Sequence, residues 1–542
     1  MAEMTTDQKT NQAVEQATAA MRALNLEAAH AIAHEAIDAG SEHPFLLKVQ
    51  ALWLHEHGQH AEALRTFHHA RVLAPDDPMI LNGIAGVLSA MGAHANAMKI
   101  LDTSLRMAPN LVTTNYMRGW TFEALRDYPN AQRAYERTLV LRPGHVQALA
   151  GLATTAARLQ NFALARASAE QALALVPGDP TATTALALAD IAGGDPAAAE
   201  SRMRALLTQK QPYATRAIAC GVLGDALDAM DKTDAAFDAY TAENAALKSL
   251  HAAGAAQEQR LAGELAALAQ NLEAAPSNRP KPAAGTASGG TRAHVFLLGF
   301  MRSGTTLLEQ VLASHPDVVT LEETDLLVEP AQSFLGDVAG LSRLQVASTE
   351  DLNRLRDAYW QGVEAQGLDP KGKIFIDKHP LNTAKLPLIA KLFPDARILF
   401  AVRDPRDVVF SCYRRHFEIH PFTYSFLTLE SAARVYDAVM TIGAWSRQNL
   451  PLPFRLLRYE DLVADFEGQV RGACDFIGVE WNEQLRDFAA HAASREITSQ
   501  SASQVRRGLY AEGDGRWRSY ANKLAAILPI LEPWIREFGY GE

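Results

Sequence analysis

Four prolines recur at one fixed spacing in the first half of this 542-residue chain, each 34 residues after the last: Pro75, Pro109, Pro143 and Pro177. Twelve residues before each proline stands an alanine: Ala63, Ala97, Ala131 and Ala165. Eight residues before each proline the chain has Phe67, Leu101, Tyr135 and Ala169. A proline ends a helix, and a small residue lets two helices cross closely. The spacing therefore predicts a repeated unit of two helices.

This pattern resembles the tetratricopeptide repeat, a helix–turn–helix of 34 residues. Weaker matches extend it in both directions, so we expect six or seven repeats across residues 10–250. The resemblance implies an α-helical superhelix with a concave face. Such a face binds an extended peptide or another protein, and a spacer or dimerisation arm is the alternative.

The composition changes after the repeats. Residues 251–274 have the pattern of one amphipathic helix, which we expect to cap the array. Residues 275–292 are rich in proline, glycine, alanine and serine, and predict a flexible linker. A second domain is therefore expected at residues 293–542.

The charge and the cysteines exclude several classes of protein. The net charge of −11 argues against a nucleic-acid binder, and no long apolar run suggests a membrane span. The three cysteines, Cys220, Cys412 and Cys474, are far apart and form no metal-binding motif, so no metal is expected. The first residues are polar and do not look like a secretion signal. We therefore expect a cytoplasmic protein.

The first motif of the second domain is a phosphate-binding loop. Residues 294–298 (HVFLL) predict a buried parallel strand, and the loop GFMRSG then leads into the helical pattern TTLLEQVL. Gly299 and Gly304 have the Walker spacing, but Thr305 replaces the lysine that serves a γ-phosphate. The loop should bind phosphate through backbone N–H groups, and the missing lysine argues against ATP or GTP hydrolysis.

The second motif lies about 100 residues further on, in RILFAVRDPRDVVFS at residues 397–411. RILFAV predicts another buried strand, and the residues after it predict a helix. Arg403 falls at the end of the strand and Ser411 about two helical turns later. A guanidinium and a hydroxyl at such places can bind a phosphate. Arg406 and Arg414 can be read as surface charges.

Together the two motifs resemble those of sulfotransferases, over roughly residues 294–540. The resemblance implies an α/β P-loop-like domain with a parallel sheet and the co-substrate 3′-phosphoadenosine-5′-phosphosulfate (PAPS). It implies that the 5′-phosphosulfate is bound by Arg302, Ser303, Gly304, Thr305 and Thr306. It further implies that Arg403 and Ser411 bind the 3′-phosphate.

The resemblance is closest to the tyrosylprotein branch of sulfotransferases. There, matching positions imply Glu323 as the general base, Lys378 and Arg302 at the transferring group, and Tyr459 near the nucleotide. They also imply that Ser501 and Arg516 close over the nucleotide phosphates, although the family has lysine where this chain has Arg516. Glu322 and His379 remain alternatives to Glu323 as the base.

The resemblance implies sulfuryl transfer from PAPS to an acceptor hydroxyl, with protein tyrosine as the first expectation and the repeats recruiting a protein partner or substrate. A glycan, lipid or small-metabolite acceptor, or an inactive binding scaffold, remains open. Members of the branch in the secretory pathway carry a membrane anchor and cysteine pairs, of which this sequence shows no sign.

Overall fold

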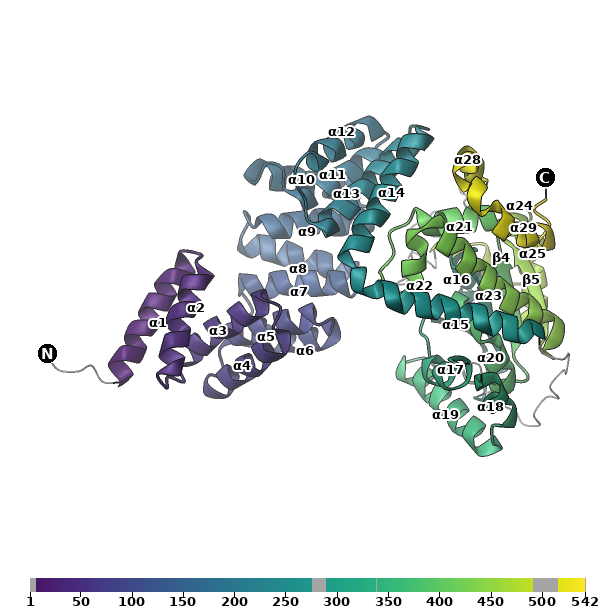
Figure 1. The fold of residues 1–542 in the computed structure, drawn as a ribbon, viewed down its shortest axis with the longest axis horizontal. Helices are drawn as coiled ribbons and strands as arrows, with labels where there is room; N and C mark the ends of the chain where they lie inside the picture. The colour runs from purple at the N-terminus through teal and green to yellow at the C-terminus, as the bar shows by residue number, and fades with distance from the viewer. Residues whose placement is uncertain (1–5, 275–288, 338, 491–514, 542) are drawn as a thin grey trace. The chain divides into compact units, whose positions relative to one another are not determined.

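A computed structural model describes residues 6–274, 289–337, 339–490 and 515–541 (Figure 1). The chain divides into two compact units between Asp195 and Pro196. This division lies inside the predicted repeat array, so the last helices of the array belong to the same unit as the β-sheet. Most of the predicted linker at 275–292 lies outside the described residues, and the domain limits drawn from the sequence stay predictions.

The first unit consists of consecutive helices joined by short turns. Their bounds are α1 Thr6–Arg22, α2 Leu26–Asp38, α3 Pro44–Glu56, α4 His60–Leu73, α5 Pro78–Ala90, α6 His94–Met107, α7 Val112–Ala124, α8 Tyr128–Leu141, α9 Val146–Arg158, α10 Phe162–Leu175 and α11 Pro180–Ala192. From α1 to α10, each helix packs against the helix that follows it in the chain. This is the arrangement that the 34-residue spacing predicts.

The residues that define the repeat have the predicted structural roles. Helices α4, α6, α8 and α10 each end two residues before one of the four prolines. The four alanines that recur twelve residues before the prolines are fully buried, which lets the two helices of a repeat approach closely. Phe67, Leu101 and Tyr135 are buried between helices. The prediction of helical repeats is confirmed.

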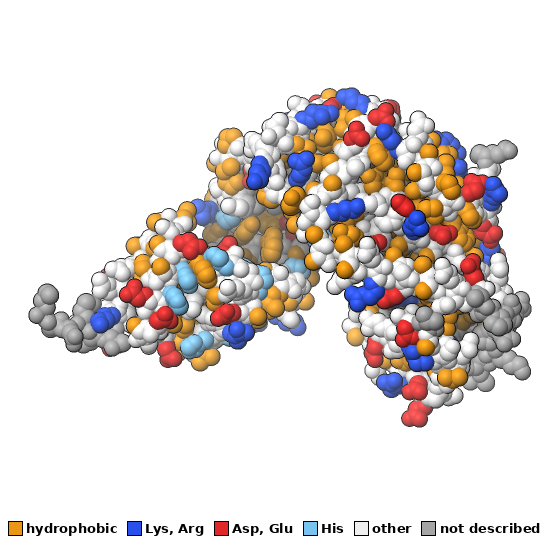
Figure 2. Space-filling view, viewed as in Figure 1, with side chains coloured by type: hydrophobic (Ala, Val, Ile, Leu, Met, Phe, Trp, Pro, Cys, Tyr) orange, Lys and Arg blue, Asp and Glu red, His pale blue; other side chains and the backbone are white. Residues whose placement is uncertain are grey.

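Histidine side chains gather on the surface of the first unit (Figure 2). The Trp53 ring stacks on His30 at 4.0 Å and on His57 at 3.8 Å between ring centroids. Burial, reinforced by the nearby His34, lowers the pKa of His30, so its ring is neutral at pH 7. The stack ties helix α2 to helix α3.

The second unit begins with four helices and a short 3₁₀ turn: α12 Pro196–Leu207, α13 Tyr213–Asp228, α14 Thr233–Leu250, η1 Ala252–Gly254 and α15 Ala255–Ala274. Helices α13 and α14 form the last pair of the predicted array. Helix α15, expected from residues 251–274, packs along α22 Pro421–Tyr424 and α23 Leu429–Asn449. Its role as a cap for the array stays a prediction.

The centre of the second unit is a five-stranded sheet in the order β2-β3-β1-β4-β5, with every neighbouring pair parallel. The strands are β1 Ala293–Gly299, β2 Val318–Glu322, β3 Ile374–Lys378, β4 Arg397–Val402 and β5 Phe454–Arg458. Strands β1 and β4 fall where the apolar runs and motifs of the sequence place them. The predicted α/β fold with a parallel sheet is confirmed.

Helices cover both faces of the sheet. The crossover and flanking elements are α16 Thr305–Ala313, α17 Val328–Leu335, α18 Gly340–Val346, α19 Thr349–Ala365, η2 Pro380–Lys385, α20 Leu386–Leu392, α21 Pro405–Tyr413, η3 Ser425–Leu427, α24 Tyr459–Ala464, α25 Phe466–Ile477, η4 Glu483–Leu485, η5 Arg516–Tyr520, α28 Ala521–Leu524, η6 Ala525–Ile527 and α29 Leu528–Glu537. Among the described residues, no helix is both long and apolar enough to cross a lipid bilayer.

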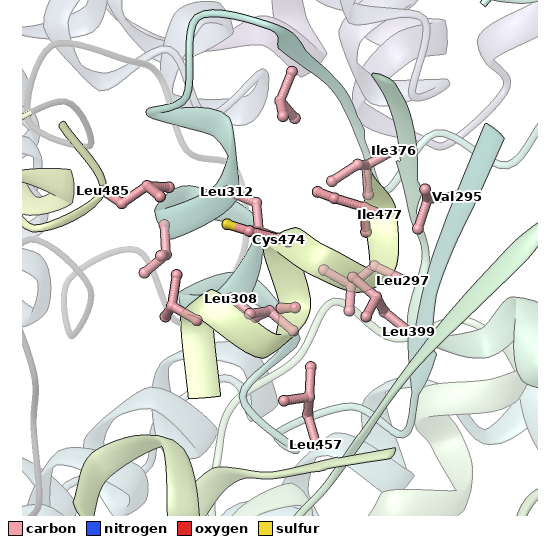
Figure 3. Close-up of a cluster of buried hydrophobic side chains, with 14 of the residues drawn as sticks. Val295, Leu297, Leu308, Leu312, Ile376, Leu399, Leu457, Cys474, Ile477 and Leu485 are labelled. Atoms are coloured by element: carbon pink, nitrogen blue, oxygen red, sulfur yellow. The ribbon is translucent and has the colours of Figure 1, made fainter. Parts of the chain in front are cut away.

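A hydrophobic core lies between one face of the sheet and helices α16 and α25 (Figure 3). Val295 and Leu297 of β1 point into it, together with Leu308 of α16 and Ile477 of α25. Side chains of a strand alternate between its faces, so Phe296 points the other way, into a group of aromatic rings. This packing on both faces fixes the position of β1 in the domain, and with it the position of the loop that follows.

A buried polar chain lies on the aromatic side of the sheet. Tyr359 Oη donates to Asp377 Oδ2 at 2.7 Å, and His294 Nε2 lies 3.1 Å from Tyr359 Oη. Burial raises the pKa of Asp377 to about 7, although the Tyr359 hydrogen bond opposes this change. The folded protein therefore binds a proton at Asp377 at a pH where the unfolded chain, with an ordinary pKa of about 3.9, has lost it.

Replacing Asp377 with asparagine tests this titration. The folded pKa is raised, so the wild type loses stability as the pH rises from about 4 to about 7. Asp377→Asn can still accept from Tyr359 but cannot ionise. We expect its melting temperature, relative to wild type, to rise between pH 5 and pH 8 in thermal unfolding followed by circular dichroism. Asp369→Asn, an exposed control, should show no such trend. An equal difference at both pH values would contradict the assignment.

Candidate functional site

The loop between β1 and α16 is shaped by two glycines. A Cβ at Gly299 would lie 2.3 Å from the carbonyl oxygen of Ala401 in β4. Gly304 has φ 90°, and a Cβ there would lie 2.6 Å from the ring of Tyr459. Ser303, Thr305 and Thr306 are buried at the start of α16. Glycine is therefore required at both ends of the loop, and the helix N-terminus behind it offers N–H groups to an anion.

Arg302 joins this loop to the second motif. Its backbone has φ 69°, a left-handed conformation that costs free energy for a non-glycine residue. Its side-chain Nε donates to Ser411 Oγ on α21 at 3.0 Å. Two residues that the sequence analysis assigned to different phosphates of one nucleotide are thus in direct contact.

The surroundings of Arg302 are strongly positive. Burial and the charges of Arg415, Arg403 and Arg414 lower the pKa of Arg302 to about 9, although Cys412 opposes this. The guanidinium still carries its charge at pH 7. Several guanidinium groups so close together favour the binding of an anion with more than one negative charge.

Arg403 and Tyr459 lie at the same edge of the sheet. Arg403 follows β4 directly, and its guanidinium lies 4.8 Å from the ring centroid of Tyr459, the first residue after β5. The side chain of Asp407, one helical turn on, lies 3.9 Å from Arg403. The carboxyl ends of β1, β4 and β5 thus bring Arg302, Arg403, Ser411 and Tyr459 together, where ligands bind in open parallel sheets.

A second cluster surrounds Lys378 at the end of β3. Its Nζ lies 2.8 Å from Glu323 Oε1, 3.2 Å from Glu309 Oε2 and 3.7 Å from Glu322 Oε1. The Lys378 side chain is fully buried, whereas that of Glu323 is 36% exposed. One cation therefore holds three carboxylates, and of these Glu323 is the most accessible to a substrate.

The backbone also marks Glu323. It has φ 42°, and its N–H donates to the carbonyl oxygen of Lys378 at 2.8 Å. The left-handed turn directs Glu323 to Lys378 from outside the sheet. His379, the alternative base, has its Nδ1 buried with no hydrogen-bond partner among the described residues, and burial lowers its pKa.

Glu309 was not singled out by the sequence analysis. It lies on α16, and burial, together with the charges of Glu322 and Glu323, raises its pKa to about 7 although Lys378 opposes this. The available signal was a charged residue inside the apolar pattern TTLLEQVLA, at a position that faces the sheet. Through Glu309, the helix that begins at the loop also holds Lys378.

The C-terminal candidates have different outcomes. Ser501 lies outside the described residues. Arg516 opens η5, and its Nη2 donates to Asp228 Oδ1 of α13 at 2.6 Å. The N–H groups on either side of it, at Gly515 and Trp517, donate to Asp407 at 2.7 and 2.8 Å. Arg516 is thus fixed near Arg403 through Asp407, with its guanidinium directed to Asp228.

Of the two arginines that could be read as surface charges, Arg406 is buried and Arg414 is partly buried. Arg406 pairs with Asp404 at 2.7 Å and lies over the Trp517 ring at 3.7 Å. Arg414 pairs with Asp228 at 3.0 Å. The surface interpretation was wrong because the acidic and aromatic partners of both arginines are distant in the sequence. Within the described ranges, no group of three His, Cys, Asp or Glu side chains is placed to hold a metal ion.

Comparisons with known proteins match both halves of the chain. A sulfotransferase family model matches residues 294–483, and a tetratricopeptide repeat model matches residues 116–180. A solved tetratricopeptide repeat protein of Parabacteroides merdae is 19% identical with a TM-score of 0.35, covering 44% of this chain and 93% of that chain.

The curated relatives each match a little under half of this chain. An uncharacterized protein of Aquifex aeolicus is 26% identical over 45% of this chain and 33% of its own length. The protein-tyrosine sulfotransferase of Drosophila melanogaster is 29% identical over 46% of this chain and 53% of its own length. A putative protein-tyrosine sulfotransferase of Caenorhabditis briggsae is 24% identical over 45% of this chain and 88% of its own length. The match thus spans about a third of the first relative and about half of the second.

The Lys378 cluster predicts a strong coupling between two substitutions. Lys378→Met leaves the buried Glu309 carboxylate without its cation, which should cost about 3–5 kcal/mol of unfolding free energy. Adding Glu309→Gln should restore part of the melting temperature at pH 8. Lys391→Met, whose Nζ donates to a main-chain carbonyl, is the control and should change little. A double variant no more stable than Lys378→Met would contradict this coupling.

Proposed function

We propose that the sulfotransferase-family domain of this tetratricopeptide-repeat protein transfers a sulfuryl group from PAPS to an acceptor hydroxyl. The first candidate for this acceptor is the phenol of a protein tyrosine. The observation that carries the proposal is the contact of Arg302 with Ser411. It joins a phosphate loop without the Walker lysine to a residue pair suited to a second phosphate. PAPS is a nucleotide that carries anionic groups at both its 5′ and its 3′ position.

The site offers a place for each end of the donor. The loop from Gly299 to Gly304 and the start of α16 would hold the 5′-phosphosulfate, with Arg302 beside it. Arg403 and Ser411 would hold the 3′-phosphate through charge-assisted and neutral hydrogen bonds. Tyr459, which lies against both Gly304 and Arg403, would pack near the nucleotide between the two phosphate positions.

The transfer itself needs a base and a charge stabiliser. The acceptor oxygen would attack sulfur, the bond from sulfur to the bridging oxygen would break, and the nucleotide 5′-phosphate would leave with that electron pair. Glu323 would accept the acceptor's proton, since a phenol has a pKa of about 10 and requires a base at neutral pH. Lys378 and Arg302 would stabilise the negative charge that builds on the departing oxygens.

The acceptor is the less constrained part of the proposal. Two relatives named above are described as protein-tyrosine sulfotransferases, the second of them putatively. The helical repeats support a protein acceptor or partner, because stacked repeats present extended surfaces that suit polypeptides. Glu323 is exposed enough to meet a side chain presented by another protein.

Transfer assays test the acceptor class. The full chain should move labelled sulfate from PAPS to tyrosine peptides, and the label should be released with tyrosine O-sulfate after digestion. Phenylalanine peptides of the same sequence are the control. Label that appears in glycans or lipids of a cell extract but in no peptide would contradict the tyrosine assignment while leaving the sulfuryl transfer standing. Absence of label in every fraction would contradict the enzyme proposal.

Arg403→Ala tests recognition of the 3′-phosphate. Calorimetric titration should show about 10- to 100-fold weaker binding of 3′-phosphoadenosine-5′-phosphate (PAP), because one or two charge-assisted hydrogen bonds are lost. Adenosine 5′-monophosphate, which has no 3′-phosphate, should bind the variant and the wild type alike. An equal loss for both nucleotides would assign Arg403 a general structural role instead.

Glu323→Gln tests the base. We expect turnover to fall by about 10²–10⁴ while PAP affinity stays within a few-fold of wild type. The adjacent Glu322→Gln is the matched control, since both carboxylates face Lys378, and it should retain most of the turnover. The reverse pattern would move the base to Glu322, and loss of turnover only in His379→Ala would move it to His379.

A further inference from the structure

Helices α13 and α14 present acidic side chains to the basic residues that follow α21. Both helices lie outside the segment that matches the sulfotransferase family, which starts at residue 294. Four ion pairs join these two helices to the segments that carry the candidate site: Asp225–Arg415 at 3.6 Å, Asp228–Arg414 at 3.0 Å, Asp228–Arg516 at 2.6 Å and Glu243–His416 at 2.9 Å. The last helix pair of the repeat array therefore compensates part of the positive charge around the candidate nucleotide site.

Asp228 is the centre of these contacts. Its carboxylate accepts hydrogen bonds from Arg414 Nη1 at 3.0 Å, from Arg516 Nη2 at 2.6 Å and from Tyr520 Oη. Arg516 Nη2 also donates to the Asp228 carbonyl oxygen at 2.9 Å. Burial opposes the ionisation of Asp228, but these donors outweigh it and lower its pKa. One ionised carboxylate thus holds two guanidinium groups from distant segments.

Those two guanidinium groups lie at the edge of the cluster around Arg302. Arg414 directly follows α21, the helix that carries Ser411, and its charge acts on Arg302. Arg516 lies between Gly515 and Trp517, whose N–H groups bind Asp407 beside Arg403. Asp228 therefore contacts two arginines at the edge of the candidate site, and of these Arg516 is tied to the Arg403 side through Asp407.

We propose that Asp228, on the last repeat-like helix pair, is the positioning residue that holds Arg516 in place for the nucleotide phosphates. This inference rests on the proposed function. Two long cationic side chains beside one another repel and would turn to solvent, and a buried carboxylate between them fixes both at short range. The nucleotide site is then completed by a residue from outside the sulfotransferase-like segment.

A double-mutant cycle on PAP affinity tests this role in the full chain. Calorimetry should show about tenfold weaker PAP binding for Asp228→Asn and for Arg516→Ala. The double variant should bind no more weakly than Arg516→Ala alone, since Asp228 acts through Arg516. Asp234→Asn is the matched control. Asp234 also pairs with a cation of the C-terminal segment that carries Arg516, namely Lys523, but its side chain is 87% exposed. It should leave PAP affinity unchanged.

Several outcomes would overturn the inference. Asp228→Asn with a lower melting temperature but unchanged PAP affinity would show that Asp228 serves only stability. Tighter PAP binding would show that Asp228 competes with the nucleotide for Arg516, and additive losses in the double variant would show that it does not act through Arg516. If wild type binds no PAP, the proposed function itself fails and this inference fails with it.

A second variant covers the case in which Asp228→Asn does not fold. Asp228→Glu keeps the buried negative charge but moves the carboxylate by one methylene group, so its contacts with Arg516 and Arg414 are displaced while the charge that compensates both arginines remains. We expect Asp228→Glu to bind PAP more weakly than wild type. Combined with Arg516→Ala, it should bind PAP as Arg516→Ala alone does. Wild-type affinity in Asp228→Glu together with an additive double variant would overturn the positioning role.

Discussion

The accumulation of positive charge at the carboxyl edge of the sheet is the constraint on which the rest of the second unit depends. Arg302 lies half-buried among other arginines, with its Nε on Ser411 and its pKa lowered to about 9. Such a group is stable only with anions nearby. The fold supplies some of them as carboxylates on α13 and α21, and leaves an environment suited to a multiply charged ligand.

Helix α16 connects this positive region to the Lys378 cluster. Its N-terminus begins at the loop that carries Arg302, and Glu309, one turn further on, reaches Lys378 at 3.2 Å. Lys378 in turn contacts Glu323 at 2.8 Å. Helix α16 would therefore position both a ligand bound at the loop and the proposed base Glu323. A direct transfer between two bound substrates would require such fixed relative positions.

Local patterns predicted much of this structure. Pro75 and Ala63, with their counterparts, were sufficient for the helical repeats, because the cause of each feature lies within one 34-residue unit. The motifs around Arg302 and Arg403 placed two strand ends correctly. The contact of Asp228 with Arg516 could not be predicted, since the partners are 288 residues apart and neither belongs to a local pattern. The burial of Arg414 was misjudged for the same reason.

Titration of the full chain with PAP and with ATP, each without and with Mg²⁺, distinguishes a site for a 3′-phosphorylated nucleotide from an ordinary nucleoside triphosphate site. We expect PAP to bind without metal and more tightly than ATP by about tenfold or more, because Arg403 and Ser411 would recognise a 3′-phosphate that ATP lacks. ATP binding that depends on Mg²⁺, with no binding of PAP, would rule out the proposed donor site.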